Sequence, residues 1–290
     1  SLPLIPGMST AQASNDYPII FVHGLGWGFG DSILGLEYWG GADSIIEDLE
    51  SQGHEVYTVN VSPFASNWDR ACQLYAAIKG DRVDFGEAHS REFGHDRFGK
   101  TYEGVYPDWD AENKVHLVGH SMGGQTIRVL ATLLEEGSSQ EQEVSTDISP
   151  LFSGNLNGWV KSVTSISTPH DGSLVADDIN EFLPFVEDLI IWTSRHLDSD
   201  KFFNFGLDHW GLEKRDDETV EEYYDRLFDS DIWNTEDISS HDLSTQGAAE
   251  LNSWVESQSN IYYFSISNSA TWEGPISGTH YPRVEMNPLL

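Results

Sequence analysis

Residues 115–134 read VHLVGHSMGGQTIRVLATLL, an apolar strand-like run joined to an amphipathic helical pattern by one tight turn. The turn, Gly119-His120-Ser121-Met122-Gly123, fits G-x-S-x-G, in which a serine lies at a sharp bend between a strand and a helix. Such a bend lifts the hydroxyl of Ser121 above the sheet at a helix N-terminus, whose dipole favours a developing negative charge. The stretch predicts a nucleophilic serine; the alternative is a surface turn that contains serine by chance.

The rest of the chain alternates strand-like and helix-like segments. Helical patterns at 44–52, 69–78 and 125–134 alternate with strand-like segments at 19–22, 56–59, 115–118, 160–166 and 261–266. Strands that alternate with helices imply right-handed crossovers and a mostly parallel sheet with helices on both faces. The sequence therefore predicts the α/β class.

Two segments interrupt this alternation. Residues 80–110 are rich in Gly, His, Asp and aromatics without a clear period, and residues 172–245 are long and acidic. No interdomain linker is evident, so the simplest organisation is one domain, 16–290, with two insertions. Ala11-Gln12-Ala13 resembles a cleavage site, so residues 1–15 are interpreted as a remnant of processing or cloning.

The charge of the chain excludes some functions. Asp and Glu number 48 against 15 Lys and Arg, which gives a net charge of −33. Such a surface repels phosphates, so nucleic-acid binding is not expected. We interpret the acidity as adaptation to saline surroundings, with an ordinary acidic secreted protein as the alternative. No apolar run approaches the roughly 18 residues of a membrane span, so no transmembrane segment is expected.

A serine hydrolase also needs two oxyanion donors, an acid and a histidine. The donors should be the N–H groups of Met122, after the serine, and of Leu25, in the loop after the first strand. The acid and histidine should follow later strands, but beyond residue 266 there is no Asp, and His280 is the last His. Glu273 and His280 are too close in sequence for another strand between them. We therefore expect the triad acid and base beyond the end of this chain.

Several motifs together resemble one family. The chain resembles the zinc-containing thermoalkaliphilic true lipases of Gram-positive bacteria, which are related to the staphylococcal lipases. The resemblance implies an α/β-hydrolase fold, secretion, and hydrolysis of triacylglycerols at an oil–water interface through a Ser121 acyl-enzyme. The motifs are Phe21-Val22-His23-Gly24, Tyr38-Trp39-Gly40-Gly41, Ser66-Asn67-Trp68-Asp69-Arg70-Ala71-Cys72, the serine turn, Thr168-Pro169-His170-Asp171-Gly172, Asp208-His209-Trp210-Gly211-Leu212 and His280-Tyr281-Pro282.

The same resemblance implies that the C-terminal part of the family's domain, with the acid, the histidine and most of a calcium site, lies outside this chain. Two alternatives stay open. One is an esterase on soluble short-chain esters, and the other is a truncated, non-catalytic hydrolase fold that binds zinc. Oligomeric state, acyl-chain preference and calcium binding are not predictable from these residues.

A metal site is implied by the resemblance rather than by spacing. His89 and His95 lie six residues apart in the 80–110 insertion, which alone favours solvated loop histidines. With the resemblance, Asp69, His89, His95 and Asp242 align with the family's structural zinc site, which would tie the two insertions together. Two carboxylates would neutralise Zn²⁺, and an oxygen–nitrogen ligand set suits that ion.

The segment Ile179–Trp192 has the pattern of an amphipathic helix. Its apolar side chains gather near one face, which fits either a core helix or a lid over an apolar cleft. The resemblance favours the lid, because the family carries a lid helix in this segment. The face comprises Phe182, Phe185, Val186, Leu189, Ile190 and Trp192.

Overall fold

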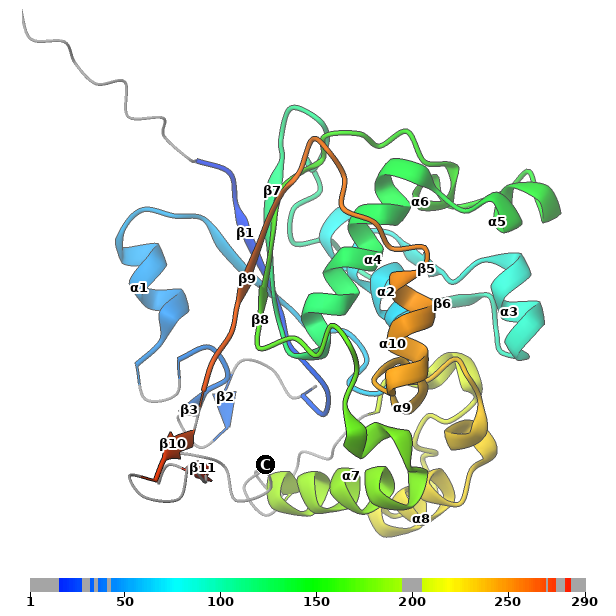
Figure 1. The fold of residues 1–290 in the computed structure, drawn as a ribbon. Helices are drawn as coiled ribbons and strands as arrows, with labels where there is room; N and C mark the ends of the chain where they lie inside the picture. Colours follow the sequence, from blue (N-terminus) through cyan, green and yellow to red (C-terminus); the bar gives the residue numbers. More distant parts are fainter. Residues whose placement is uncertain are drawn as a thin grey trace, which may run out of the picture.

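A five-stranded parallel sheet forms the centre of the protein (Figure 1). The structure is a computed structural model, and it describes residues 16–27, 32–33, 36–40, 43–194, 205–269, 271–274 and 280–282. The strand order is β4-β1-β7-β8-β9, and every neighbouring pair runs parallel. The bounds of these strands lie within two residues of the predicted ones. Their bounds are β1 Ile19–Val22, β4 Val56–Val59, β7 Val115–His120, β8 Val160–Ile166 and β9 Tyr262–Ile266.

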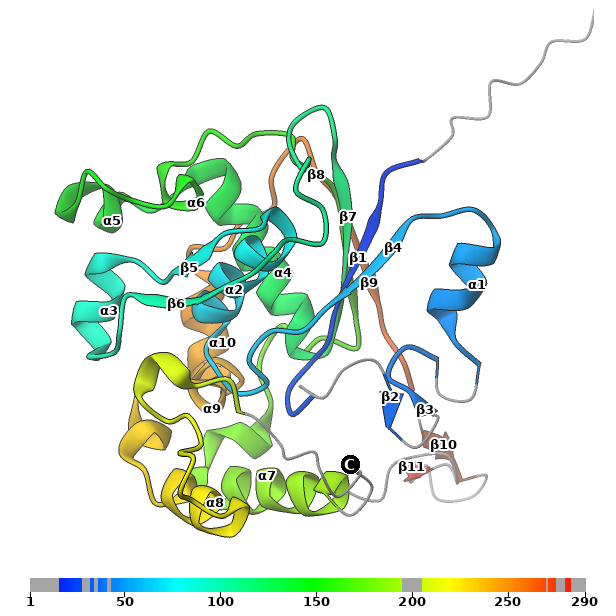
Figure 2. The same cartoon turned by 180° about the vertical axis from the view of Figure 1, so that it is seen from behind.

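Helices cover both faces of the sheet, which confirms the predicted α/β class. Helices α2 (Asn67–Lys79) and α4 (Met122–Glu136) pack on one face, and α1 (Ile45–Ser51) lies on the other (Figures 1 and 2). Alternate side chains of β1 point to opposite faces, as in any strand. Ile20 therefore joins the large core under α2 and α4, while Phe21 joins the smaller cluster on the α1 side.

Local sequence fixes where these helices begin and end. The hydroxyl oxygen of Ser66 accepts a hydrogen bond from the N–H of Asp69 and caps the N-terminus of α2. Gly80 ends that helix with φ 83°, a left-handed conformation that glycine adopts without a Cβ penalty. Ser44 caps α1 in the same way as Ser66 caps α2, by accepting from the N–H of Glu47.

Residues 80–110 form a short hairpin and a helix. Strands β5 (Arg82–Asp84) and β6 (Phe98–Thr101) pair antiparallel, and α3 (Glu87–Phe93) connects them. No period was visible in the sequence here because each element has seven residues or fewer. Gly86 cannot cap α3 with a side chain; instead the buried carboxylate of Glu141 accepts hydrogen bonds from the N–H groups of Ala88 and His89.

The remaining elements surround the sheet. Helix α7 (Ile179–Ser194) matches the predicted amphipathic segment, although the side chains of residues 189–194 lie outside the described set. Residues 1–15, interpreted above as a remnant, also lie outside the described residues. The others are α5 (Ser139–Val144), α6 (Pro150–Ser153), α8 (Val220–Phe228), α9 (Ser239–Asp242), α10 (Thr245–Asn252), the 3₁₀ turns η1 (Leu174–Asp177), η2 (Asp208–Trp210) and η3 (Asp231–Asn234), and the strands β2 (Ser32–Ile33), β3 (Leu36–Glu37), β10 (Thr271–Glu273) and β11 (His280–Pro282).

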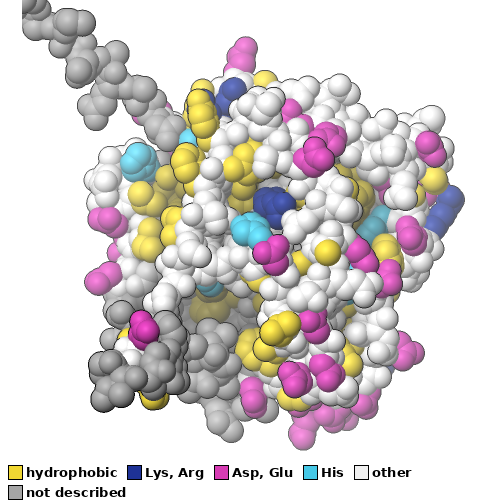
Figure 3. Space-filling view, in the orientation of Figure 1, with side chains coloured by type: hydrophobic (Ala, Val, Ile, Leu, Met, Phe, Trp, Pro, Cys, Tyr) yellow, Lys and Arg dark blue, Asp and Glu magenta, His cyan; other side chains and the backbone are white. Residues whose placement is uncertain are grey.

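The surface reflects the acidic composition. Acidic side chains outnumber basic ones on the face drawn in Figure 3 and gather over the region of α7 and α8. Among the described residues, none of the helices combines the length and the apolar composition that a membrane crossing requires.

Candidate active site and metal centre

Ser121 occupies a strained bend between β7 and α4. Its backbone has φ 55° and ψ −129°, a conformation that costs free energy for a residue with a Cβ atom. Its N–H donates to the carbonyl oxygen of Ile166 at the end of β8 (2.9 Å), which fixes the bend to the neighbouring strand. The predicted strand–turn–helix geometry is therefore present, with Ser121 half-buried at the carboxyl end of the sheet.

Two glycines allow the backbone to close around this bend. A Cβ atom on Gly119 would overlap the backbone of Gly123, and one on Gly123 would overlap the carbonyl oxygen of Val22. The start of α4 thus touches the end of β1 through backbone alone. Larger residues at either position would push the serine away from the loop that follows β1.

The loop after β1 contains an N–H group without an acceptor in the described part of the chain. The N–H of Gly24 donates to the hydroxyl oxygen of Tyr38 (2.8 Å), and the N–H of Gly26 donates to the carbonyl oxygen of Pro63 (3.1 Å). Between them, the N–H of Leu25 has no acceptor among the described residues. Met122, the first residue of α4, likewise has an N–H group that no helical carbonyl can reach.

Histidines beside the serine hold the surrounding loops. The hydroxyl of Tyr38 accepts a hydrogen bond from the N–H of Gly24 and forms a second one with Nδ1 of His120 (2.5 Å), whose pKa is lowered by burial. Burial, aided by the charge of Arg70, lowers the pKa of His23 to about 3. Neutral His23 donates from Nδ1 to the carbonyl oxygen of Gly24 (2.8 Å) and accepts at Nε2 from the N–H of Val61 (3.3 Å).

Within the described residues, no general base is hydrogen-bonded to Ser121. No histidine among them is hydrogen-bonded to Oγ of Ser121. Glu273 and His280 are backbone partners in the antiparallel β10–β11 pair, so they occupy adjacent short strands. The side chain of His280 lies outside the described set.

Arg70 connects the serine region to α2. Its guanidinium group is fully buried and donates to the carbonyl oxygen of His23 (2.6 Å), the hydroxyl of Thr126 on α4 (2.9 Å) and the carbonyl oxygen of Ser62 (2.5 Å). Burial lowers the pKa of Arg70 to about 10, so the side chain stays cationic near neutral pH. One buried cation therefore joins the β1 loop to the helix that begins after Ser121.

An apolar cluster lies beside the serine. Met122 belongs to it, and α7 contributes the buried side chains of Phe182 and Val186. Leu25 and Phe185 pack at its margin. Helix α7 thus packs its apolar face on the cluster that contains Met122 and borders Leu25.

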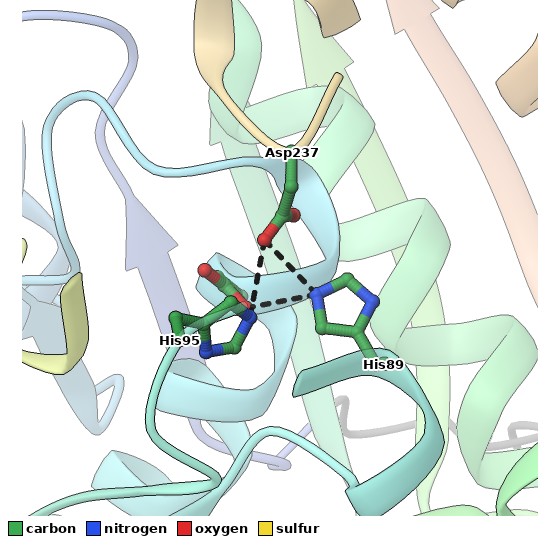
Figure 4. Close-up of side chains that lie close together, drawn as sticks. His89, His95 and Asp237 are labelled. Atoms are coloured by element: carbon green, nitrogen blue, oxygen red, sulfur yellow. Dashed lines mark ion pairs between the residues drawn. The ribbon is translucent and has the colours of Figure 1, made fainter. Parts of the chain in front are cut away.

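A second group of side chains, distinct from the serine region, brings together Asp69 of α2, His89 of α3, His95 and Asp237. One potential ligand atom from each lies within 4.8 Å of the others. His89 Nε2 is 3.4 Å from Asp69 Oδ1 and 3.2 Å from Asp237 Oδ2, and His95 Nε2 is 3.2 Å from Asp237 Oδ2. Figure 4 shows the three labelled side chains pointing toward one another from separate segments.

These four atoms fit a metal ion. Asp69 Oδ1, His89 Nε2, His95 Nε2 and Asp237 Oδ2 are all buried, and each lacks a hydrogen-bond partner within the described residues. Buried polar groups without partners are costly, and two nitrogen and two oxygen atoms are a set that Zn²⁺ accepts. The structure brings together three of the four predicted residues, Asp69, His89 and His95.

The fourth predicted residue, Asp242, lies outside this group, and Asp237 completes it instead. Asp242 is partly buried beside the group, where its carboxylate accepts a hydrogen bond from the N–H of Asn67, the first residue of α2. An antiparallel bridge between Ala65 and Ile238 brings Asp237 to the cluster. Both aspartates stand within six residues of each other, so the sequence did not distinguish them.

Neighbouring groups orient the histidines of this cluster. His95 donates from Nδ1 to the carbonyl oxygen of Asp96 (2.9 Å), which leaves the lone pair of Nε2 directed at the cluster. The ring of Trp68 stacks on that of His89 with centroids 5.0 Å apart, and Glu141 holds the backbone N–H of His89. Burial lowers the pKa of His89, but the adjacent carboxylates of Asp237 and Asp69 more than offset this and raise it to about 10.

Three comparisons relate the chain to known proteins. Residues 15–289 match the family model described as "Lipase-like, C-terminal domain". A lipase of Staphylococcus epidermidis is 43% identical over 270 residues, which cover 90% of this chain and 39% of that protein. The chain thus spans about two fifths of the length of this curated relative.

Two solved structures have the same fold. EstA from Clostridium botulinum superposes with a TM-score of 0.86 at 47% identity, covering 95% of this chain and 66% of the other. The Staphylococcus hyicus lipase superposes with a TM-score of 0.77 at 40% identity, covering 93% and 71%. These matches confirm the expected α/β-hydrolase fold.

Proposed function

Because the chain belongs to the family of lipase-like C-terminal domains, we propose that it forms the core of a serine carboxylic-ester hydrolase that cleaves triacylglycerols. The observation that carries the proposal is the backbone strain at Ser121 between β7 and α4. Strain of this kind is retained where the rest of the fold enforces it, and it is common at active sites.

In the proposed reaction, Oγ of Ser121 attacks the acyl carbonyl carbon and forms a tetrahedral oxyanion. The N–H groups of Leu25 and Met122 donate to this oxyanion, which is consistent with their lack of another described acceptor. When the intermediate collapses, the alcohol leaves with the proton given up by Ser121 and an acyl-serine remains. Water then hydrolyses the acyl-serine to the carboxylic acid and the free serine. The general base is not assigned to any described residue.

We propose that α7 is a lid over an apolar acyl-binding surface. Support comes from Phe182, Val186 and Phe185, which pack on the cluster that contains Met122. A lid shields such a surface in water and exposes it at a lipid interface. This role favours emulsified long-chain esters over soluble short-chain esters.

The test measures hydrolysis of emulsified long-chain triacylglycerol and of a soluble short-chain ester by the purified protein at its full expressed length, because the acid and base are expected outside residues 1–290. Ser121→Ala should abolish both activities. Phe185→Asp should lower the long-chain activity more than the short-chain activity, whereas Phe264→Asp, at an exposed phenylalanine of β9, should change neither. Equal losses with Phe185→Asp would favour a soluble-ester esterase, and absence of both activities in the unmodified protein would favour a non-catalytic, metal-binding domain.

We further propose that Asp69, His89, His95 and Asp237 hold a structural Zn²⁺ ion. Four protein ligands would leave no open position, so we assign the ion no catalytic step. When bound, it supplies a cross-link between α2, the 80–110 hairpin and the segment before α9. Metal analysis of the purified protein should find about one zinc per chain, and chelation should lower the melting temperature.

The proposal includes secretion and a saline habitat. A lipase must reach its oil droplets, and the net charge of −33 is tolerated best where salt screens repulsion. Both points rest on the family resemblance and on composition.

A further inference from the structure

The two carboxylate oxygens of Asp69 have different surroundings. Oδ2 accepts a hydrogen bond from Nε2 of His209 (2.6 Å), while Oδ1 belongs to the four-atom group described above. The side chains of Asp69 and His209 are 0% and 2% exposed, so water does not compete for this bond. His209 therefore occupies one oxygen and leaves the other for the cluster.

His209 is itself held in place by two further contacts. Its ring stacks on that of Phe85, with centroids 4.2 Å apart and planes inclined by 27°. Its carbonyl oxygen accepts from the N–H of Asp96 (2.9 Å), the residue that follows His95. The η2 turn thus fixes His209 against two of the segments that carry cluster residues.

His209 does not itself belong to the cluster. The atoms that lie within 4.8 Å of one another come from Asp69, His89, His95 and Asp237, and Nε2 of His209 is already committed to Asp69. Its position outside the ligand group, bonded to a ligand oxygen, is the arrangement by which outer residues orient metal ligands.

We propose that His209 is a positioning residue that restricts Asp69 to one-oxygen coordination of the metal ion. A carboxylate without such a partner can bind a metal through both oxygens, which would change four-coordinate geometry to five-coordinate. This inference rests on the proposed metal site and adds a residue to which the sequence assigned no role.

The test compares three variants with zinc as the probe. His209→Gln keeps an amide donor near the position of Nε2, His209→Asn holds its donor too far from Asp69, and His209→Phe keeps a stacking ring without a donor. Zinc affinity, measured by competition with a chromophoric chelator, should fall about 10- to 100-fold in the Phe and Asn variants. The Gln variant should stay within about threefold of the unmodified protein. His241→Phe, which removes a bond to Glu250 instead, is the matched control and should leave affinity unchanged.

Cobalt(II) substitution gives a second readout that packing alone would not move. The unmodified and Gln proteins should show the intense visible absorption of four-coordinate cobalt, and the Phe and Asn variants the weaker absorption of five-coordinate cobalt. Unchanged affinity and spectrum in folded Phe and Asn variants would overturn the role of His209 while leaving the site intact. Absence of zinc binding in the unmodified protein would instead overturn the proposed metal site. If the Phe variant does not fold, the Gln and Asn pair decides, since these amides differ only in reach.

Discussion

Gly24 packs directly against Ser121: a Cβ atom built on Gly24 would stand 2.7 Å from Cβ of Ser121 and 3.1 Å from its Oγ. Gly24→Ala should therefore displace the serine or the β1 loop and lower ester hydrolysis by at least about tenfold, because misplacement on the order of 1 Å can cost about 100-fold. Gly53→Ala is the control, since a methyl group there meets nothing within 4 Å. Because Gly53 has φ 90°, Gly53→Ala should lower stability, but it should leave activity intact. An active Gly24→Ala protein would show that this contact does not constrain the nucleophile.

Substitution of the two neighbouring aspartates separates the predicted from the observed metal group. Asp237→Asn removes a charged ligand and should lower zinc affinity by at least about 100-fold. Asp242→Asn should leave it within about threefold, because the carboxylate of Asp242 bonds to the N–H of Asn67 instead. Chelator competition measures both. The reverse order of effects would restore Asp242 as the ligand.

Asp242, which is partly buried, should make the free energy of unfolding fall as pH rises. Burial raises the pKa of Asp242 from its usual 3.8 to about 7, so the folded protein holds a proton that the unfolded chain releases at lower pH. The free energy of unfolding should therefore decline from about pH 4 to pH 7 through this group. Asp242→Asn should remove that part of the decline and be more stable at pH 8 by on the order of 1 kcal/mol or more. Urea unfolding from pH 5 to pH 8 measures it, and parallel curves for the two proteins would contradict the assignment.

Salt should stabilise the protein by screening its net charge of −33. The melting temperature should rise with NaCl, and most of the rise should be complete by 1 M, because the Debye length is about 10 Å at 0.1 M and about 3 Å at 1 M. Calorimetry at fixed pH measures this. A flat or falling curve would remove the support for saline adaptation, and a rise that stays linear above 1 M would point to salting-out of apolar surface instead.

The central sheet and the serine bend were predictable because their signals are local. A parallel strand buried on both faces is a continuous apolar run, as at 19–22, and β1 formed there. The bend at Ser121 needs small residues at fixed offsets, which a five-residue pattern records.

The 82–101 region and the metal group were less predictable. Elements of three to seven residues complete too few turns or alternations to show a period. Asp237 and Asp242 share one segment, and only the bridge between Ala65 and Ile238 decides which of them approaches His89. The bond of His209 to Asp69 joins residues 140 positions apart, so no local pattern could have indicated it.

The most direct test of the account asks whether Ser121 is the nucleophile. A p-nitrophenyl alkylphosphonate should add one equivalent to the protein, and peptide mass mapping should place it on the peptide that contains Ser121. Ser121→Ala should not be labelled. In the unmodified protein, ester hydrolysis should be lost in proportion to the labelling. A preparation that hydrolyses esters while Ser121 stays unmodified, or equal labelling of Ser121→Ala, would contradict the account.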